Sequence, residues 1–269
     1  MKDYRVKPGH ALDWKDVDPG DTGPFNTKDD ALKETEKLIE KLDVYQERLY
    51  AEAKHGLLIV LQAMDTAGKD GTIRHVMRGI NPQGCRVTSF KVPTPEESAH
   101  DFLWRVHPHV PAKGYIAIFN RSHYEDVLVT RAHKLISRKE ARRRFEEIND
   151  FEKILRRNGT TILKFHLVIS KAEQKQRLEK RLEDPQRYWK FSLTDLKERR
   201  YWGRYRQAYA EALSATSTPH APWYLIPANH KWYRNYLVAR IIASTLKDLH
   251  PHYPPAPRGV NFHKLKIPS

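Results

Sequence analysis

Five short apolar runs recur along the chain, separated by longer amphipathic segments. The runs cover residues 57–62, 85–92, 115–119, 160–169 and 223–228. The first run contains neither proline nor a charged residue, which is typical of a strand buried on both faces of a parallel sheet. Because strands and helical patterns alternate, the sequence predicts an α/β fold with a parallel sheet covered by helices on both faces.

Helix starts are marked by three capping boxes, in which a Thr or Ser is followed three residues later by Glu. The boxes begin at Thr94, Ser137 and Ser170. Apolar residues near helical spacing indicate a further long helix before the first strand and another at the end of the chain. Helices are therefore expected over residues 29–55, 72–80, from Pro95 to about Val106, 137–158, 170–182 and 231–249.

The two ends of the chain differ from its centre. Residues 1–28 begin with a segment rich in Pro, Gly and Asp, which we interpret as an extended arm laid over the surface. Residues 251–269 are rich in proline at their start and are predicted to form a tail. The whole chain, 1–269, is expected to be one domain.

The segment AMDTAGKDG, which follows the first strand, predicts a phosphate-binding loop. It is close to the pattern G-x-x-x-x-G-K-[ST], with Ala63 in place of the first Gly and Asp70 in place of the Ser or Thr. Loop N–H groups and the positive end of the following helix would converge on an anion, and Lys69 would add a full charge. The pattern also fits an ordinary strand-to-helix turn with a surface lysine. Asp65 and Asp70 favour the phosphate site, because they supply hard oxygen ligands for Mg²⁺.

A second polar loop, NRSHYED over residues 120–126, follows the third strand. Ligands of open α/β sheets bind outside the carboxyl ends of the strands. We therefore expect this loop and the first one to face the same crevice.

A basic, aromatic stretch from Arg177 to Arg206 carries ten Lys or Arg against five Asp or Glu. Asp184-Pro185 breaks its helical pattern, and a second helix is expected to begin near Ser192 or Thr194. A helix–loop–helix beside a phosphate site is how a lid is built, so we interpret residues 177–206 as a lid. The alternative is a solvated basic helix pair whose aromatic residues pack on the body.

The formal net charge of the 269-residue chain is +15, which calls for a polyanionic partner or an anionic substrate. Nucleic acid, an acidic membrane surface and polyphosphate all satisfy this. The single cysteine, Cys85, excludes a disulfide framework and a cysteine-based zinc site. Mean hydropathy is −0.74, and no apolar run approaches the roughly 20 residues that a membrane span needs. The polar first residues do not resemble a signal peptide. We therefore expect a cytoplasmic location.

Four separated motifs together resemble the polyphosphate kinase 2 family, and NRSHYED resembles its class III branch. The motifs are MDTAGKDG at 64–71, FNRSHYEDV at 119–127, SKAEQKQRLEKRLEDP…WKFS at 170–192 and YLIPANHKWYRN at 224–235. The resemblance covers roughly residues 30 to 250. It implies a P-loop kinase-like three-layer sandwich with a five-stranded parallel sheet and a helical lid.

The same resemblance implies the chemistry. The family transfers a phosphoryl group between inorganic polyphosphate and a nucleotide with Mg²⁺ or Mn²⁺. The class III branch uses AMP and ADP as acceptors, so ADP and ATP would be the products, and the reverse reaction is open to it. We further expect a homo-oligomer, and neither nucleic acid nor a membrane as partner.

By position, the resemblance assigns roles to individual residues. Asp65, Lys69, Arg121, Arg177 and Arg181 would be catalytic, and Asp65 and Glu125 would hold the metal. Asn120 stands where many members of the family have Asp, which shifts attention for the metal from this position to Glu125 and Asp126. Phosphate binding would involve Ala67, Gly68, Lys69, Asp70, Gly71, Arg74 and Lys190, and nucleotide binding Asn120, Arg121, Glu125 and Asp126.

Two other functions were weighed. An ATP-dependent nucleotide kinase on the same fold needs only a local basic cluster, whereas the basic surplus here extends along the chain. A basic nucleic-acid-binding protein with a decayed P-loop would not need to keep Lys69 and Asp65, and no nucleic-acid-binding module is recognisable.

Overall fold

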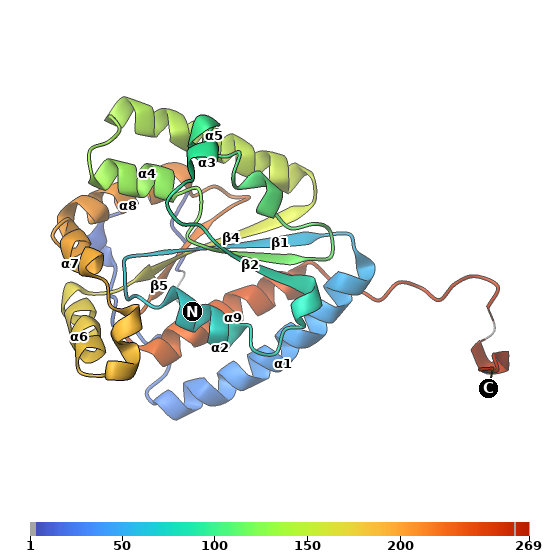
Figure 1. Ribbon diagram of the computed structural model, residues 1–269. Coiled ribbons are helices and arrows are strands. Elements are labelled where there is room, and N and C mark those ends of the chain that lie inside the picture. The colour runs from blue at the N-terminus through green and yellow to red at the C-terminus, as the bar shows by residue number, and fades with distance from the viewer. Residues whose placement is uncertain (1–3, 261, 269) are drawn as a thin grey trace.

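A five-stranded sheet, in which all neighbouring strands are parallel, forms the centre of the computed structural model, which describes residues 4–260 and 262–268 (Figure 1). The strand order is β2-β3-β1-β4-β5. The prediction of five parallel strands is confirmed. The strands are β1 (Gly56–Ala63), β2 (Cys85–Ser89), β3 (Ile116–Asn120), β4 (Thr160–Val168) and β5 (Trp223–Pro227).

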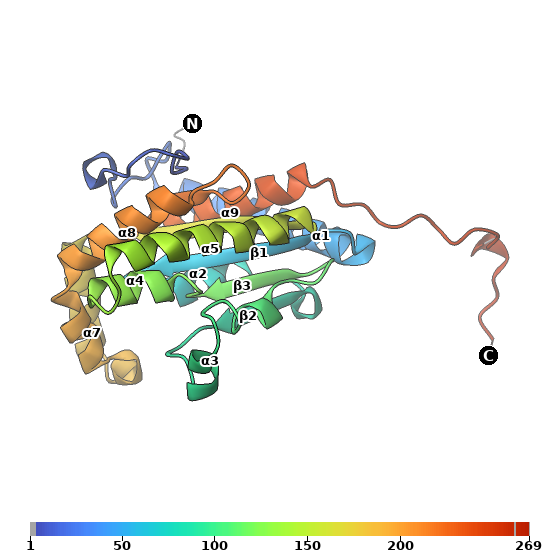
Figure 2. The ribbon, with the colours of Figure 1, turned by 90° about the horizontal axis from the view of Figure 1, so that it is seen from above.

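Helices cover both faces of the sheet, which makes three layers (Figures 1 and 2). One face carries α1 (Lys28–Glu52), α2 (Lys69–Val76) and α9 (Lys231–Asp248), and the other carries α4 (Glu125–Ala132), α5 (Arg138–Arg157) and α8 (Trp202–Thr216). The remaining helices are α3 (Pro95–Ala99), α6 (Lys171–Leu182) and α7 (Leu193–Arg199), and short 3₁₀ turns lie at Trp14–Asp16, Pro82–Gly84, His107–His109, Pro185–Lys190 and Phe262–Lys264. None of the helices in the described part of the chain is both long and apolar enough to cross a membrane.

Strand β1 is central, and all eight of its residues are buried. Its side chains alternate between the two apolar cores: Leu57 and Ile59 pack with α1 and α9, and Leu58 and Val60 pack with α5 and α8. Two-sided burial explains why this strand reads as a continuous apolar run rather than as an alternating one.

One helix prediction is wrong, and the sequence pattern predicted neither α4 nor α8, which continues from the expected lid to Thr216 and packs on the core. The helix predicted from Pro95 to about Val106 ends at Ala99, because the Asp101 carboxylate accepts hydrogen bonds from the amides of Leu103 and Trp104 and turns the chain. Helix α4 was not expected at all: it begins within the NRSHYED segment, which we had interpreted as a loop. The other boundaries differ by a few residues, as in α2, which begins at Lys69 rather than at Thr72.

The segment before α1 runs along the free edge of β5. Val6 N–H donates to Trp223 O, and Leu225 N–H donates to Tyr4 O, both at 2.8 Å. Further on, the Trp14 indole donates to Arg206 O on α8 at 2.8 Å. This arm therefore occupies a sheet edge that would otherwise present unpaired backbone groups. At the other end of the chain, residues 250–253 lie against α1, and residues 254–260 extend away from the body (Figures 1 and 2).

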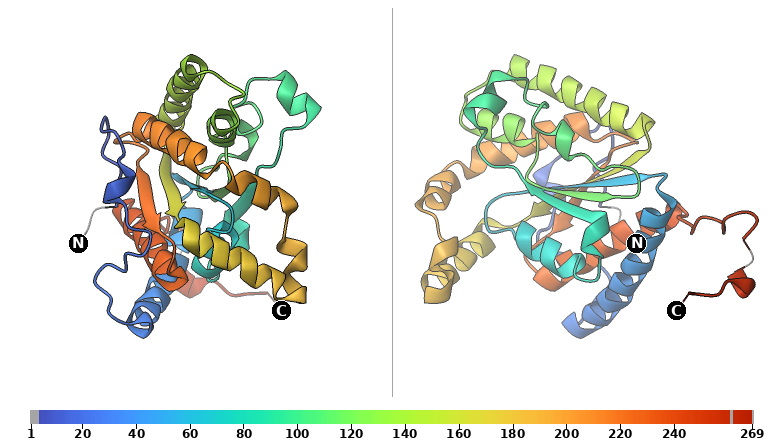
Figure 3. Two further views of the ribbon diagram at one scale, coloured as in Figure 1. Left: turned by 90° about the vertical axis from the view of Figure 1, so that its left-hand side faces the viewer. Right: turned by 45° about the vertical axis from the view of Figure 1, so that its right-hand side comes forward.

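Helices α6 and α7 stand at the carboxyl ends of the strands, beside the point where β1 runs into α2 (Figures 1 and 3). The turn Pro185–Lys190 joins them, and the Asp184 side chain caps that turn. The predicted break at Asp184-Pro185 is therefore present, and α7 begins at Leu193, close to the predicted start.

A fully buried ion pair connects the sheet to the helices of one face beneath the NRSHYED segment. Lys164 on β4 donates to Glu152 on α5 at 2.5 Å, to the Tyr124 hydroxyl at 2.9 Å and to Thr216 O on α8 at 2.7 Å. The Tyr124 hydroxyl donates in turn to Glu152 at 2.8 Å. Because every charged atom of the pair has a partner, the network fixes the chain after β3 against the core.

Removing one member of this pair should be strongly destabilising. We expect Lys164→Met to lower the free energy of unfolding by about 3–5 kcal/mol, because Glu152 is left buried and unpaired. Lys175→Met is the matched control: Lys175 is exposed and pairs with Glu179 at 3.5 Å, so its loss should cost less than about 1 kcal/mol. Urea denaturation measures both, and a Lys164→Met cost no larger than that of the control would contradict the role given to the network.

Candidate active site

The loop after β1, residues 63–69, turns its carbonyl groups toward the protein. Asp65 O accepts from the Gln174 amide at 3.0 Å. Thr66 O and Ala67 O accept from Arg177 at 3.1 and 3.0 Å, and Ala67 O also accepts from Arg234 at 2.9 Å. The other three carbonyls of this phosphate loop are bound by groups of the loop or of α2: Ala63 O by Lys69 Nζ, Met64 O by Ala67 N–H, and Gly68 O by Thr72.

This arrangement fixes the direction of the loop amides. In a trans peptide the C=O and the next N–H point in opposite directions, so the N–H groups of Thr66, Gly68 and Lys69 face the open side of the loop. Thr66 and Gly68 have φ values of 66° and 104°, in the left-handed region. Helix α2 begins directly afterwards at Lys69, which adds the positive end of its dipole. The loop therefore has the geometry of an anion site.

Lys69 and Asp70 lie at the mouth of the loop. Burial lowers the pKa of Lys69, although Asp65, Glu125 and Asp70 oppose this shift. The Lys69 ammonium donates to Ala63 O at 3.1 Å. Asp70 accepts from the Asn120 amide at 2.7 Å, which joins the phosphate loop to the end of β3. The two loops thus face one crevice, as the positions of the strands predict.

Arg121 reaches across that crevice from the end of β3. Its φ of 63° is unusual for a residue other than glycine, and its guanidinium donates to Asp65 at 3.1 Å. Burial lowers the pKa of Arg121, but the charges of Glu125 and Asp65 outweigh it and the net shift is upward. Burial raises the pKa of Glu125, against the attraction of Arg121 and Lys69. Two cations and two carboxylates therefore share this position.

The carboxylates suit a divalent cation only in part. No group of three or more His, Cys, Asp or Glu within the described residues could hold a metal ion. Asp65 and Glu125 nevertheless offer hard oxygen atoms that face the same charges, Lys69 and Arg121. Mg²⁺ is commonly bound by one or two carboxylates together with substrate phosphates and water, so this donor set fits that ion when phosphate supplies the remaining ligands.

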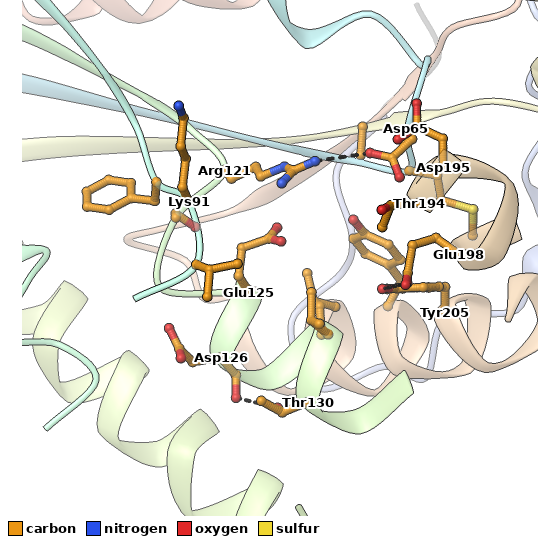
Figure 4. A pocket seen from close by; sticks show the side chains of 18 of the residues that line it. Asp65, Lys91, Arg121, Glu125, Asp126, Thr130, Thr194, Asp195, Glu198 and Tyr205 are labelled. Atoms are coloured by element: carbon orange, nitrogen blue, oxygen red, sulfur yellow. Dashed lines mark hydrogen bonds and ion pairs between the residues drawn. The ribbon is translucent and has the colours of Figure 1, made fainter. Parts of the chain in front are cut away.

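A cavity of about 600 Å³ opens beside the phosphate loop (Figure 4). Arg121 points toward Asp65 at one end, and Asp195 lies close to Asp65. Glu125 and Asp126 of α4 line another part of the wall. Apolar and aromatic side chains make up much of the remaining wall: Phe90, Val92, Pro93, Leu128, Val129, Leu135, Trp202, Tyr205 and Tyr209.

Four polar contacts hold α7 over this cavity. Arg199 donates to Gln174 at 2.6 Å, and Gln174 also binds the phosphate loop. Glu198 accepts from the Tyr205 hydroxyl at 2.6 Å and lies 2.8 Å from the His133 ring nitrogen. Asp195 pairs with Arg181 of α6 at 3.3 Å. The helix is thus attached to the loop, to α4 and to α6.

The structure brings most of the predicted site residues together, but it places Arg177 differently from our expectation. Arg177 was expected to close on the phosphates from the lid. Its guanidinium is instead buried behind the loop, where it donates to four backbone carbonyls and to Glu173. Those contacts use its donors, so Arg177 supports the loop rather than facing the crevice.

The other expected site residues vary in position. Arg181 donates to Lys190 O at 3.0 Å, which folds the lid turn back onto α6. Lys190 is exposed, with its ammonium 4.7 Å from the centre of the Trp189 ring. Arg74 is exposed on α2. Asp126 lies deeper: burial raises its pKa, against the attraction of Arg105 and Arg144.

Several residues of the site were missed from the sequence. Gln174 and Arg234 both bind the phosphate loop directly. Gln174 lies three residues before Arg177, on the same face of α6, and this spacing could have indicated a shared target. Arg234 lies in the first turn of the helix after β5, at the edge of the sheet where ligands bind. Nothing in the residue pattern indicated the contacts of Glu198, since they join three separate helices.

A central parallel sheet, an anion-binding loop between β1 and α2, and a cation–carboxylate cluster at the end of β3 define a P-loop phosphotransferase. A sequence model of the family described as Polyphosphate kinase 2 (PPK2) matches residues 25–254. The chain therefore belongs to the polyphosphate kinase 2 family.

Individual relatives agree with this placement. An AMP/ADP-polyphosphate phosphotransferase of Meiothermus ruber is 53% identical over 255 residues, covering 94% of this chain and 96% of that protein. An ADP-polyphosphate phosphotransferase of Rhodopseudomonas palustris is 42% identical over 269 residues, covering 94% and 92%. The crystal structure of polyphosphate kinase 2 from Arthrobacter aurescens TC1 superimposes with a TM-score of 0.92 at 45% identity, covering 96% of this chain and 92% of that one.

Removing the charge of Lys69 should slow transfer without unfolding the protein. Deleting one preorganised charge of this kind typically costs on the order of 10²–10³ in rate, and we expect a loss of kcat of that size for Lys69→Ala. Lys175→Ala, on the exposed face of α6, is the control and should retain wild-type turnover. More than about a tenth of wild-type kcat in Lys69→Ala, in a folded protein, would show that the phosphate loop is assigned wrongly.

Proposed function

We propose that this protein transfers phosphoryl groups from inorganic polyphosphate to AMP and ADP, giving ADP and ATP, with the reverse reaction available. One observation carries the proposal: Ala63, Met64 and Asp65 at the start of the phosphate loop line the cavity together with Arg121, whose guanidinium donates to Asp65. The loop suits the phosphate chain, and the cavity has room for a nucleoside. The names of the two relatives given above support the same substrates.

The proposed mechanism asks this chain for positioning and positive charge rather than for a covalent step. The loop amides and Lys69 hold the phosphoryl group being transferred. Arg121 leaves its contact with Asp65 to bind the acceptor phosphate, which places donor and acceptor in line. Both cations act in a partly buried site, where each charge is worth more than it is in water.

Asp65 and Glu125 would hold Mg²⁺ or Mn²⁺ together with phosphate oxygens. The ion, when bound, neutralises charge that develops on the transferring group. The role of Asp65 follows from its place: it lies between the loop and Arg121, so it can exchange an arginine partner for a metal. Glu125, on the first turn of α4, approaches the same cations from the cavity side.

The apolar part of the cavity would receive the nucleoside. The wall formed by Phe90, Val92 and Leu128 offers surfaces rather than hydrogen-bond donors to a base. Tolerance of both AMP and ADP requires that an extra phosphate fit near the end of β3. The neutral Asn120 there repels such a phosphate less than an Asp would.

We propose that the segment from α6 to α7 acts as the lid. Arg181 and Lys190 belong to it, and the contact between Arg181 and Asp195 would give way to a phosphate chain as the lid closes. The predictions of a homo-oligomer and of a cytoplasmic location stay predictions.

The direct experiment is to incubate the purified protein with polyphosphate, Mg²⁺ and either AMP or ADP, and then to separate the nucleotides. ADP and ATP should form from AMP, and ATP from ADP, and a chelator such as EDTA should abolish both reactions. A matched reaction with ATP as donor and no polyphosphate tests the rival ATP-dependent kinase. Turnover that needs ATP and ignores polyphosphate would overturn the proposal.

Added salt should weaken the use of polyphosphate more than the use of the nucleotide. The chain carries a formal charge of +15, and a long polyanion that meets many Lys and Arg loses affinity at each contact as salt is raised. KM for long-chain polyphosphate and KM for ADP, measured over a series of KCl concentrations, decide the point. Equal slopes in the two plots would mean that the basic surplus does not hold the donor.

A further inference from the structure

Arg234 occupies an unusual position directly beneath the phosphate loop. It lies in the first turn of α9, after β5, and is 2% exposed. Its guanidinium donates to Ala67 O at 2.9 Å and, through two other nitrogen atoms, to the Asn235 side-chain oxygen at 3.1 and 2.9 Å. All of these acceptors are neutral.

The charge of Arg234 therefore has no carboxylate partner. Within the described residues no Asp or Glu lies within ion-pair distance of it, whereas Arg177, the other guanidinium on Ala67 O, pairs with Glu173 at 2.8 Å. Burial, together with the neighbouring Arg177, lowers the pKa of Arg234 to about 9, which still leaves it charged at neutral pH. An isolated buried charge is costly, so its retention needs a reason.

Gly68, the loop residue next to Arg234, leaves room for its guanidinium. A Cβ atom at Gly68 would overlap the Arg234 guanidinium, and the φ of 104° at Gly68 independently favours glycine. The backbone of Gly68 thus lies against the guanidinium, and the Gly68 amide faces the opposite way, toward the open side of the loop. Only one layer of backbone separates the buried charge from a bound anion.

We propose that Arg234 is a positioning residue that supplies a buried positive charge beneath the phosphate loop, for which the phosphate chain is the counter-ion. This inference rests on the proposed function. Arg234 orients the Ala67 peptide through its hydrogen bond and attracts the anion through the loop, without touching it. The unpaired charge lowers the stability of the free protein, and phosphate binding offsets that cost. Arg234 therefore raises the affinity for phosphate at the expense of stability in the free protein.

The test measures binding of inorganic tripolyphosphate by calorimetry, in the absence of metal and nucleotide, to the full chain. We expect Arg234→Met to raise the Kd about tenfold, while the free energy of unfolding of the free protein stays the same or rises, because an unpaired buried charge is replaced by an apolar side chain. Arg240→Met is the matched control. It removes the same charge from α9, about 9 Å further along the helix, and should leave the Kd within about twofold of wild type.

Arg234→Lys supplies a readout that a purely structural role would not move. A buried lysine has a lowered pKa, so the variant should keep its charge at pH 6 and lose it at pH 8, whereas wild type keeps its charge at both. We expect its Kd to lie within about threefold of wild type at pH 6 and to be about tenfold weaker, relative to wild type, at pH 8. This profile decides the question even if Arg234→Met does not fold.

Three results would overturn the proposal for Arg234, and a fourth would count against the proposed function. A ratio of variant to wild-type Kd that does not change with pH in Arg234→Lys would overturn the proposal, and so would a Kd of folded Arg234→Met within twofold of wild type. Equal weakening in Arg234→Met and Arg240→Met would overturn it as well, because the effect would then be one of overall charge. Failure of the wild-type protein to bind tripolyphosphate would instead count against the proposed function.

Discussion

The direction of the peptide groups in residues 63–69 is the constraint on which the rest of the site depends. A backbone loop binds an anion only if its carbonyl oxygens are turned away, and here each one from Ala63 to Gly68 accepts a hydrogen bond from the protein. Apart from the Ala67 N–H, which binds Met64 O within the loop, the donors come from α2, α6 and α9, so three separate helices must be in place before the loop amides can face a phosphate. The tertiary fold, rather than the local sequence, thus creates the phosphate site.

This dependence also connects the loop to α7, which is part of the proposed lid. Gln174 donates to Asp65 O and accepts from Arg199 of α7. A displacement of α7 would therefore act on the loop through one side chain. Glu198 makes the corresponding connection to His133, which follows α4, and to Tyr205 of α8. Closure of the cavity and orientation of the loop peptides can therefore be coupled through short, direct contacts, without a long pathway through the core.

The sequence predicted the sheet, the phosphate loop and the facing position of residues 120–126, because each depends on local pattern and on the rule that parallel strands end at one edge. It did not predict the roles of Arg177 and Arg234. Arg177 was expected to close on the phosphates from the lid, and Arg234 was given no role. Only the packing of α6 and α9 shows that both lie behind the loop. Helix α4 was hidden for a similar reason: Tyr124 and Val127 are buried by long-range contacts, whereas the polar letters of NRSHYED suggest a loop.

The arm along β5 has a consequence for where this domain begins. The family match starts at residue 25, yet the backbone of Tyr4 and Val6 occupies the edge of β5, and Trp14 is attached to α8. A shortened chain that starts at the family boundary would keep every residue of the site and lose the cover of its sheet edge. Its defect would be self-association through β5 in concentrated solution, with catalysis per folded molecule preserved. The unit that homology delimits is therefore smaller than the unit in which the edge of β5 is covered.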